Sequence, residues 1–573
     1  MKYSYILHTL NGNITIADNV NPFDVASAKE IKITPYTVQI SSKEKGGCCL
    51  TEITVSSETE AQVYLSVYGE GEADLYSFTK LCEDERLFRQ SPHDPNNYHF
   101  KMEKSAVPMV AAVVDGQADF FISDNPSYFD NATTQHIIPA EKCFYLSSGD
   151  KGGAPNYPES EEFGPIFHTI GGETSHMFRF FAFRKPADSL KTVRREAFVA
   201  IENVFGTCSG SIYRAMCFSS NYMHIRKNER RTSDKWVVAG IEYGNTQYFR
   251  DSFYQTFILD EEIEQQAYQA VGQDVDGFTA EHPLIYMIWS YRVFAKGKEY
   301  NHKVADLAFR DILKGMDKHP DGGFYATTGP GQVEGTFKNW FDICAFEDDD
   351  ADVYNCGLLV CALECAKRMG YDIGDRKERA LKKFHTLFNG RYFQISQKKD
   401  FMVQDFAVGE VIYYYLFNET FIDDEMVRKS YRAMVDSPAK TPYGIKIVAM
   451  ADGSYVPYEM YEANGKRFPY LENCEPGRYY NGGSYHIYEM LFHICAYLHN
   501  VEDAEKNMIE RLMIDLDYDG ATHEYMHTVR GFGGKPNQGW NASIYAFWEE
   551  LVKRGRATTA FFDAAEAKLK SLV

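Results

Sequence analysis

The chain has 573 residues, of which 44% are apolar and 25% charged, a balance that is typical of a globular protein and excludes disorder throughout. Its 60 Lys and Arg residues are outnumbered by 81 Asp and Glu residues, which gives a formal charge of −21. A surface of this charge repels phosphate backbones and anionic lipids. We therefore expect neither a nucleic acid nor a membrane as a partner.

The amino terminus, residues 1–8, carries one lysine and a very short apolar run, which is not the pattern of a secretory signal. No stretch of the sequence reaches the roughly 20 apolar residues that a membrane helix needs. The 12 cysteines include no Cys-x-x-Cys pair, and Cys356, Cys361 and Cys365 fall in one apolar helical pattern. We expect reduced, buried thiols in a cytoplasmic protein, with an exported protein whose signal was removed as the alternative.

Up to about residue 185 the apolar side chains recur with a period of two, which is typical of strands. The pair Asp115-Gly116 separates two such segments and tolerates the positive φ of a hairpin turn. The sequence therefore predicts an antiparallel β-sandwich over residues 1–185, and this part shows no catalytic constellation. The alternating segments are residues 31–34, 36–40, 61–68, 109–114, 118–122 and 177–183.

After Pro186 the period changes to 3.6 residues, which is typical of helices. Residues 189–204 predict a linking helix, so we assign residues 186–210 to a linker. In residues 211–573 helices alternate with short turns or long loops, which favours helical hairpins arranged in a ring over a four-helix bundle. The expected helices are residues 252–259, 261–271, 282–296, 303–317, 354–370, 376–389, 408–417, 424–434, 484–499, 502–516, 541–553 and 558–571.

The long loops of this region hold most of its Trp, Gly and acidic residues outside the helices, and such loops are usually functional. The first candidate loop contains Tyr248, Arg250 and Asp251. A carboxylate accepts and a guanidinium donates hydrogen bonds, so adjacent Arg and Asp framed by aromatic rings can hold vicinal hydroxyls of a sugar. The alternative is that Asp251 caps the following helix while Arg250 forms an ion pair.

The second loop combines Trp340 and Asp342 with five acids among residues 347–352. Asp342 lies between Phe341 and Ile343, and apolar surroundings raise a carboxyl pKa far enough for a general acid. For the acidic run itself we expect an exposed helix N-terminus, which the helix dipole favours. A calcium loop is the alternative, although the run lacks the spaced ligands and the glycine of such loops.

The third loop joins Glu524-Tyr525 to the glycine-rich residues 531–534 and to Gly539-Trp540. Glycines let a ligand approach the backbone closely, and Trp540 offers a face for stacking. Asn481 lies in an Asn-Gly-Gly sequence ahead of another helix, where a simple turn is the alternative explanation.

Three histidines near these loops, His282, His523 and His527, offer no i,i+4 pair on one helix face. A zinc site of the helical type needs such a pair. We therefore expect neither a metal nor a cofactor.

Taken in order, these motifs resemble the six-hairpin, (α/α)6-barrel glycosidases: glucoamylases, inverting trehalases, the processing glucosidase I group and the glucosidase part of glycogen debranching enzymes. The motifs are aromatic-Arg-Asp-Ser before a helix, an acidic loop after Trp, Tyr-x-Asn-Gly-Gly before a later helix, and Glu-Tyr followed by glycines and Gly-Trp. The resemblance covers about residues 240–555. It implies a multidomain α and β chain, with the N-terminal β-sandwich followed by an (α/α)6 toroid in residues 211–573.

The resemblance also assigns roles to residues. Arg250 and Asp251 match the clamp for the non-reducing sugar, Asp342 matches the general acid and Glu524 the general base. The Glu-Ser-Gly-x-Asp pattern of trehalases and glucosidase I relatives is missing here, so Glu347 and Asp348 are alternatives for the acid. The expected substrate-binding residues are Arg250, Asp251, Tyr248, Trp340, Asn481, Tyr525 and Trp540.

The sequence thus predicts an inverting, exo-acting glycoside hydrolase that releases a terminal sugar from an oligosaccharide or glycoside. The resemblance makes an α-glucoside the first substrate to test. Three alternatives share the architecture: a disaccharide phosphorylase, a polysaccharide lyase and a non-catalytic sugar-binding protein. A phosphorylase needs a cationic phosphate pocket instead of a base carboxylate, and the charge of −21 disfavours the anionic polymer of a lyase.

Overall fold

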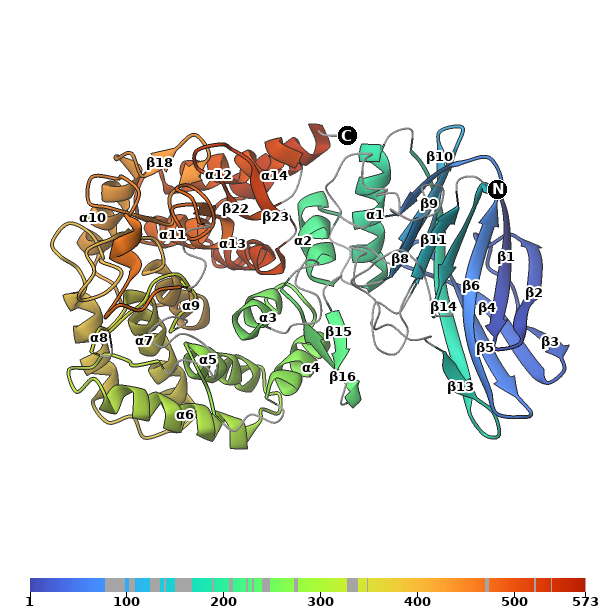
Figure 1. Cartoon of the computed structure of the whole chain (residues 1–573), viewed down its shortest axis with the longest axis horizontal. Helices are drawn as coiled ribbons and strands as arrows, with labels where there is room; N and C mark the ends of the chain where they lie inside the picture. The colour runs from blue at the N-terminus through green and yellow to red at the C-terminus, as the bar shows by residue number, and fades with distance from the viewer. Residues whose placement is uncertain are drawn as a thin grey trace. The chain divides into compact units, whose positions relative to one another are not determined.

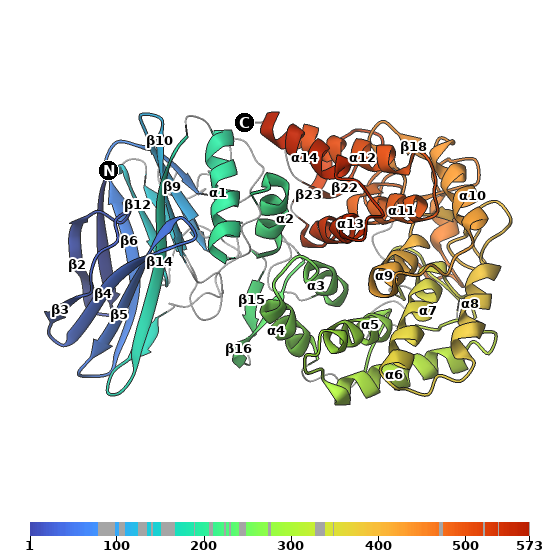
Figure 2. The same cartoon turned by 180° about the vertical axis from the view of Figure 1, so that it is seen from behind.

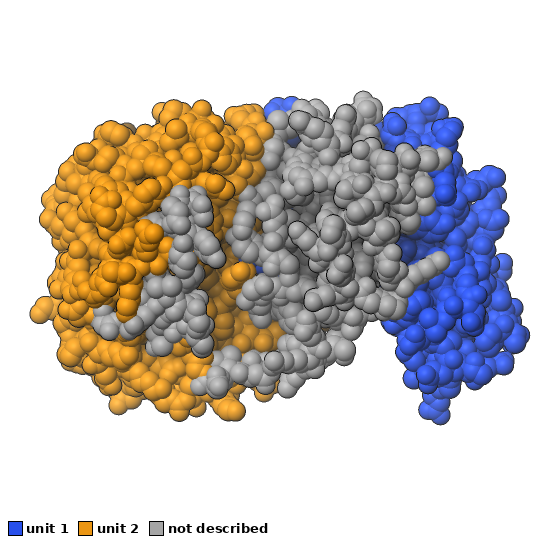
Figure 3. All heavy atoms as spheres, in the orientation of Figure 1, with its two compact units in different colours: residues 1–247, 569–573 blue, residues 248–568 orange. Residues whose placement is uncertain are grey.

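The computed structural model describes residues 1–77, 98–101, 109–123, 134–138, 141–149, 167–187, 190–205, 210–222, 225–228, 231–239, 248–272, 277–326, 338–347, 349–468, 474–519, 522–536 and 538–571. The chain forms two compact units, residues 1–247 with 569–573 and residues 248–568, which Figure 3 colours blue and orange. Antiparallel sheets in the first unit are followed by a helical region, which confirms a mixed α and β chain.

Within the described residues, the first sheet has seven antiparallel strands in the order β2-β1-β6-β12-β11-β8, with β13 also paired to β6. Its long central strands alternate side chains between two faces, as the period of two predicts. The strands are β1 (Lys2–Thr9), β2 (Gly12–Val20), β6 (Ala61–Glu70), β8 (Tyr98–Lys101), β11 (Thr134–Ile138), β12 (Cys143–Ser147) and β13 (His168–Ile170).

The second sheet, again counted over the described residues, has the order β3-β4-β5-β14-β10-β9-β7. The predicted hairpin is confirmed, since Asp115 and Gly116 have φ of 48° and 74° between β9 and β10. The strands are β3 (Lys29–Ile33), β4 (Tyr36–Lys45), β5 (Cys48–Ser57), β7 (Asp74–Ser77), β9 (Met109–Val114), β10 (Gln117–Ser123) and β14 (Ser175–Pro186).

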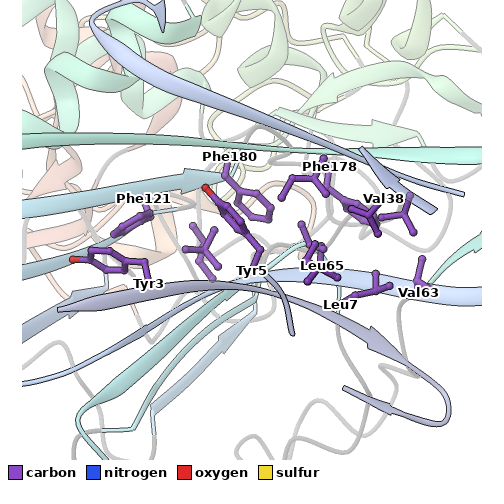
Figure 4. Close-up of a cluster of buried hydrophobic side chains, with 14 of the residues drawn as sticks. Tyr3, Tyr5, Leu7, Val38, Val63, Leu65, Phe121, Phe178 and Phe180 are labelled. Carbon is purple, nitrogen blue, oxygen red and sulfur yellow. The ribbon is translucent and has the colours of Figure 1, made fainter. Parts of the chain in front are cut away.

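The two sheets share one hydrophobic core. Tyr5 and Leu7 of β1 in the first sheet are buried in the same cluster as Val38 of β4, Phe121 of β10 and Phe180 of β14 in the second. Figure 4 shows these side chains gathered between the strands. Burial of one face of each strand explains why the alternating pattern was readable in the sequence.

The linking helix predicted over residues 189–204 is present as α1 (Leu190–Phe205). It is followed by α2 (Ile212–Tyr222) and by the hairpin of β15 (Ile225–Asn228) and β16 (Arg231–Val237), which the periodicity did not predict. The residues of these elements belong to the first unit.

The helices predicted in the second unit are all present, with small shifts at their ends (Figure 1). The largest shift is at the first helix, which begins at Phe249 and therefore includes Arg250 and Asp251. The helices are α3 (Phe249–Gln255), α4 (Glu261–Val271), α5 (His282–Ala295), α6 (His302–Asp317), α7 (Val353–Arg368), α8 (Arg376–Thr386), α9 (Ala407–Phe417), α10 (Asp424–Val435), α11 (His486–Leu498), α12 (Ala504–Asp519), α13 (Ser543–Lys553) and α14 (Ala560–Ser571).

Alternate helices of this unit differ in burial. Every residue of α7 from Val353 to Ala366 is buried, whereas α10 buries one face. In chain order α5, α7, α9, α11 and α13 each contact the next, and the 3-10 helix η7 (Gly539–Ala542) contacts α3. Figures 1 and 2 show α3, α5, α7, α9, α11 and α13 lying inward of α4, α6, α8, α10, α12 and α14.

The helical unit contains a small antiparallel sheet, two strands of which lie where the sequence indicated a loop and one where it indicated the start of a helix. It consists of β21 (Ser484–Tyr485), β22 (His523–Met526) and β23 (Gly533–Pro536), in that order. Glu524 therefore lies on a strand, not in a loop. Such short strands are specified by pairing with distant residues, and local periodicity does not reveal them.

Two further observations concern the expected cell environment. The ten cysteines within the described ranges are all buried, as expected of reduced thiols. None of the helices in the described part of the chain combines the length and the apolar character that crossing a bilayer requires.

Candidate active site

Asp342 lies on the loop between α6 and α7, where three aromatic residues surround it. The hydroxyl of Tyr480 donates a hydrogen bond of 3.2 Å to Oδ2 of Asp342. The ring of Tyr480 packs 5.6 Å from Trp340 and 5.5 Å from Phe341. Burial raises the pKa of Asp342 to about 7, and the charge of Glu281 also raises it, against the opposing charge of Arg250.

Glu524 is 2% exposed and lies on β22 between two anchored residues. The side chain of Asn541 donates a hydrogen bond of 2.8 Å to the carbonyl oxygen of His523. On the other side, the ring of Tyr525 packs against Gly534, where an added Cβ would lie 2.2 Å from the ring. The glycine-rich stretch noted in the sequence is thus needed, at Gly534, for a tyrosine that lies beside the candidate base.

Asp342 and Glu524 are far apart in the sequence, but both affect the pKa of the same two tyrosines. Burial raises the pKa of Tyr480, and the charges of Asp342 and Glu524 raise it further. Burial and the same two charges also raise the pKa of Tyr248, which is 39% exposed. The effect of a charge weakens with distance, so this shared effect indicates that both carboxyl groups belong to the surroundings of the two tyrosines.

Arg250 is held from two sides in the first turn of α3. It forms an ion pair with the buried carboxylate of Glu281, which precedes α5. Its guanidinium lies 5.6 Å from the centre of the Trp540 ring, in the geometry of a cation–π contact. The sequence left open an ion pair for Arg250, and the structure identifies the partner as Glu281.

Asp251 is buried beside Arg250, and the side chain of Gln538 donates a hydrogen bond of 2.9 Å to its Oδ1. Burial raises the pKa of Asp251 to about 6, against the opposing charge of Arg250. The N-cap position of α3 is Tyr248, so the alternative that Asp251 is the N-cap of this helix is wrong.

The other three residues expected to bind substrate are buried and hydrogen-bonded within the protein or packed on other side chains. Trp340 is fully buried, its Nε1 donates a hydrogen bond of 2.8 Å to Asp405, and its ring stacks on Tyr488 at 3.7 Å. Trp540 is 2% exposed and lies 5.7 Å from Tyr488. Asn481 accepts a hydrogen bond from Tyr461 and donates one to the carbonyl oxygen of Cys474.

The acidic run after Asp342 is largely occupied by structural contacts. Glu347 forms an ion pair with Lys398, which also pairs with Asp349. Asp352 is the buried N-cap of α7 and accepts a hydrogen bond of 2.9 Å from the backbone of Asn355. The expectation of an exposed acidic terminus is therefore wrong for Asp352, because buried amides satisfy its carboxylate; the alternative acid Asp348 lies outside the described residues.

Sequence reasoning missed the partners Tyr480, Glu281 and Gln538. Two of them had a weak local signal: Tyr480 is part of a Tyr-Tyr pair before Asn481, and Glu281 precedes the first residues of a helix. Neither signal indicates that Tyr480 meets Asp342 or that Glu281 meets Arg250, since each contact joins distant segments.

The three histidines weighed as metal ligands have other neighbours. His282 stacks on Phe249 at 4.8 Å, His523 lies 3.6 Å from Asp515, and the backbone of Val529 donates to His527. A search of the described residues finds no group of three or more His, Cys, Asp or Glu side chains suited to a metal ion.

Comparison with known proteins gives structural likeness without sequence matches. No protein family model matches the chain, and no curated protein does. Two solved structures from Thermus thermophilus each align over 59% of this chain and 100% of their own. One is an uncharacterized conserved protein, with a TM-score of 0.42 and 13% identity. The other is a GH63 mannosylglycerate hydrolase, solved with Tris and D-glycerate and with glucose, with a TM-score of 0.42 and 12% identity.

Proposed function

We propose that this protein is an inverting, exo-acting glycoside hydrolase with Asp342 as general acid and Glu524 as general base. The proposal is supported above all by Tyr480, whose hydroxyl donates a hydrogen bond to Asp342 and whose pKa is raised by the charges of both Asp342 and Glu524. Two carboxyl groups that face one substrate are what glycoside hydrolysis needs.

The two carboxyl groups would have different roles in the reaction because their protonation states differ. Asp342, with its pKa near 7, keeps its proton in a large fraction of molecules at neutral pH and gives it to the departing glycosidic oxygen. Glu524 takes a proton from a water molecule, whose oxygen forms the new bond to the anomeric carbon as the bond to the leaving group breaks. This inverting geometry requires carboxyl groups about 6.5–9.5 Å apart.

The remaining residues would hold the terminal sugar. Arg250 would donate to sugar hydroxyls and Asp251 would accept from them, and Tyr248, whose ring is exposed, would stack beside them. Tyr525 would line the site next to Glu524. We propose that Trp340, Trp540 and Asn481 support the site without contacting the sugar, because their side chains are buried. Trp340 packs on Tyr488, Trp540 packs on Arg250, and Asn481 holds the loop of Tyr480.

The charges at the site favour a neutral sugar. Asp251, Glu281, Asp342 and Glu524 are acidic, whereas two cations lie among them: Arg250, which meets Glu281, and Arg478, which acts on Tyr525. A phosphorylated or uronic sugar would place a further negative charge among these carboxyl groups. An α-glucoside remains the first substrate to test because the motifs resemble families that cleave such bonds.

We also propose the architecture in which these residues would meet. The inner helices that contact one another in sequence would close, through η7 and α3, into an (α/α)6 barrel. The two sheets that share a core would form a β-sandwich. In this proposal residues 1–185 are the sandwich, 186–210 the linker and 211–573 the catalytic domain.

The test is hydrolysis of a panel of α- and β-linked aryl glycosides and disaccharides, with product stereochemistry followed by NMR. We expect release of a sugar with inverted anomeric configuration. Retained configuration would refute the inverting mechanism, a requirement for inorganic phosphate would indicate a phosphorylase, and an unsaturated product absorbing in the ultraviolet would indicate a lyase. Binding without hydrolysis across the panel would indicate a sugar-binding protein.

Glu524→Gln, with Glu347→Gln as the matched control, tests the assignment of the base. We expect Glu524→Gln to abolish turnover while sugar binding stays measurable by calorimetry, since the amide cannot accept the proton of water. Glu347 pairs with Lys398, so its variant should keep near-normal rates. Near-normal rates for Glu524→Gln would contradict the assignment.

A further inference from the structure

A network of buried charged residues contacts His523, the residue before Glu524 on β22. Its centre is Asp515 of α12, which is fully buried. One turn away on the same helix, Nη1 of Arg511 lies 2.9 Å from Oδ2 of Asp515 and balances its charge. Burial would raise the pKa of Asp515, but the Arg511 charge and the hydrogen bond from His486 hold it below its ordinary range. Asp515 is therefore an anion in the folded protein.

This anion reaches two elements of the small sheet. Nδ1 of His486, the residue after β21, donates a hydrogen bond of 2.6 Å to Oδ2 of Asp515. Nδ1 of His523, the first residue of β22, lies 3.6 Å from Oδ1. Arg511 adds a hydrogen bond of 3.2 Å to the carbonyl oxygen of Ser484 in β21. Arg511 is thus bonded to β21, and Asp515 contacts the histidine that follows β21 and the histidine that begins β22.

The imidazole of His523 has little room to move. A Cβ added at Gly533 of β23 would lie 2.3 Å from the ring, so strand and ring are in close contact. The carbonyl oxygen of His523 is held by Asn541, as described above. Successive side chains of a strand point to opposite faces, so a grip on His523 from one face fixes the direction of Glu524 on the other.

We propose that Asp515 is a positioning residue that acts through His523 to fix Glu524. Its role rests on the proposed function of Glu524 as general base. Asp515 does not touch the substrate in this proposal; it fixes the strand so that the carboxylate of Glu524 faces the attacking water. Displacement of a catalytic group by about 1 Å costs on the order of 100-fold in rate.

The closing experiment compares Asp515→Asn with a matched control, Glu410→Gln. Glu410 is also a buried acid that pairs with a buried histidine, His499, but it lies on α9, and its other hydrogen bonds come from the backbone of Phe421 and Ile422. We expect both variants to lower Tm. Asp515→Asn should lower kcat roughly 10- to 100-fold with KM unchanged, whereas Glu410→Gln should leave kcat unchanged.

Two outcomes overturn the proposal: wild-type kcat in Asp515→Asn, or an equal loss of kcat in Glu410→Gln. His523→Gln adds a second route, because it removes the imidazole and leaves Asp515, Arg511 and His486 in place. The double variant combines Asp515→Asn with His523→Gln. If Asp515 acts through His523, the kcat of the double variant should be no lower than that of the more impaired single variant. Fully additive losses would also overturn the proposal.

Hydrogen exchange tests this inference independently of the proposed function. Asp515→Asn should speed exchange of the amides in residues 522–536 and leave residues 338–347, around Asp342, unchanged. If the wild-type protein hydrolyses nothing, the proposed function fails while this readout still decides whether Asp515 holds β22. If Asp515→Asn exchanged the amides of both segments at the same rates as the wild type, the positioning role would be refuted.

Discussion

The hydroxyl of Tyr480 donates a hydrogen bond to Oδ2 of Asp342 across 3.2 Å. This contact favours the ionised carboxylate and therefore lowers a pKa that burial raises to about 7. Burial, the charges of Arg250 and Glu281 and this hydrogen bond together place the pKa of Asp342 at about 7. A tyrosine from the turn before α11 thus controls the protonation of a carboxyl group on the loop before α7.

The first prediction concerns the effects that set the pKa of Asp342. As a general acid, Asp342 must be protonated, so kcat should fall as the pH rises through about 7. Tyr480→Phe removes a hydrogen bond to the charged form, which raises the pKa of Asp342. We expect the alkaline limb of the kcat–pH profile to move to higher pH in this variant. A profile that stays in place, or moves to lower pH, would contradict the assignment of Asp342 as the acid.

A second prediction concerns Arg250 and its buried partner Glu281. Arg250→Ala leaves the carboxylate of Glu281 buried without its cation, which typically costs about 3 kcal/mol of folding free energy. We expect urea unfolding to show this loss. The double variant Arg250→Ala, Glu281→Gln should recover part of it, because the uncompensated charge is gone.

The matched control for Arg250 is Lys398→Ala. Lys398 pairs with Glu347 and Asp349 in solvent, where such pairs contribute little. Its variant should therefore unfold close to the wild type. Equal stability of Arg250→Ala and the wild type would mean that Glu281 is not buried as the structure has it.

A third prediction concerns the contact between α7 and α9. The two helices meet at Gly357 and Gly409, where a Cβ added to Gly409 would lie 2.4 Å from the carbonyl carbon of Gly357. Gly409→Ala forces the helices apart, and overpacking of this kind costs about 1–3 kcal/mol. Gly277→Ala is the control, since an added Cβ there meets no atom of the described residues within 4 Å. Thermal unfolding should show a loss for the first variant alone.

These contacts show which parts of the structure the sequence predicts. The helix α4 has the bounds expected from its periodicity, because apolar spacing is a local property of the chain. β22 did not appear in the pattern, because four residues gain their strand conformation from pairing with β21. Local motifs led us to propose Asp342 and Glu524, whereas the contact of Tyr480 with Asp342 joins distant segments, so no local pattern indicates it.

The last prediction concerns pH and the stability of the helical unit. His499, at the end of α11, lies 2.8 Å from Glu410 of α9 and 2.6 Å from Asp424 of α10. Burial would lower the pKa of His499, but the hydrogen bonds and charges of these two carboxylates raise it above its ordinary value. The protonated imidazole therefore links three helices.

A histidine whose pKa is raised by folding stabilises the protein fully below its unfolded pKa of about 6.5, and this contribution is lost as the pH rises through the folded pKa. His499→Gln should therefore lower the free energy of unfolding by about 2 kcal/mol at pH 6, as expected for a hydrogen bond to a charged group, and by less at pH 9. Because burial also raises the pKa of Glu410, the difference should shrink again in acid, once that carboxylate takes a proton. Urea unfolding of the wild type and the variant across this range checks the window, and a difference that is constant with pH would contradict a protonated His499.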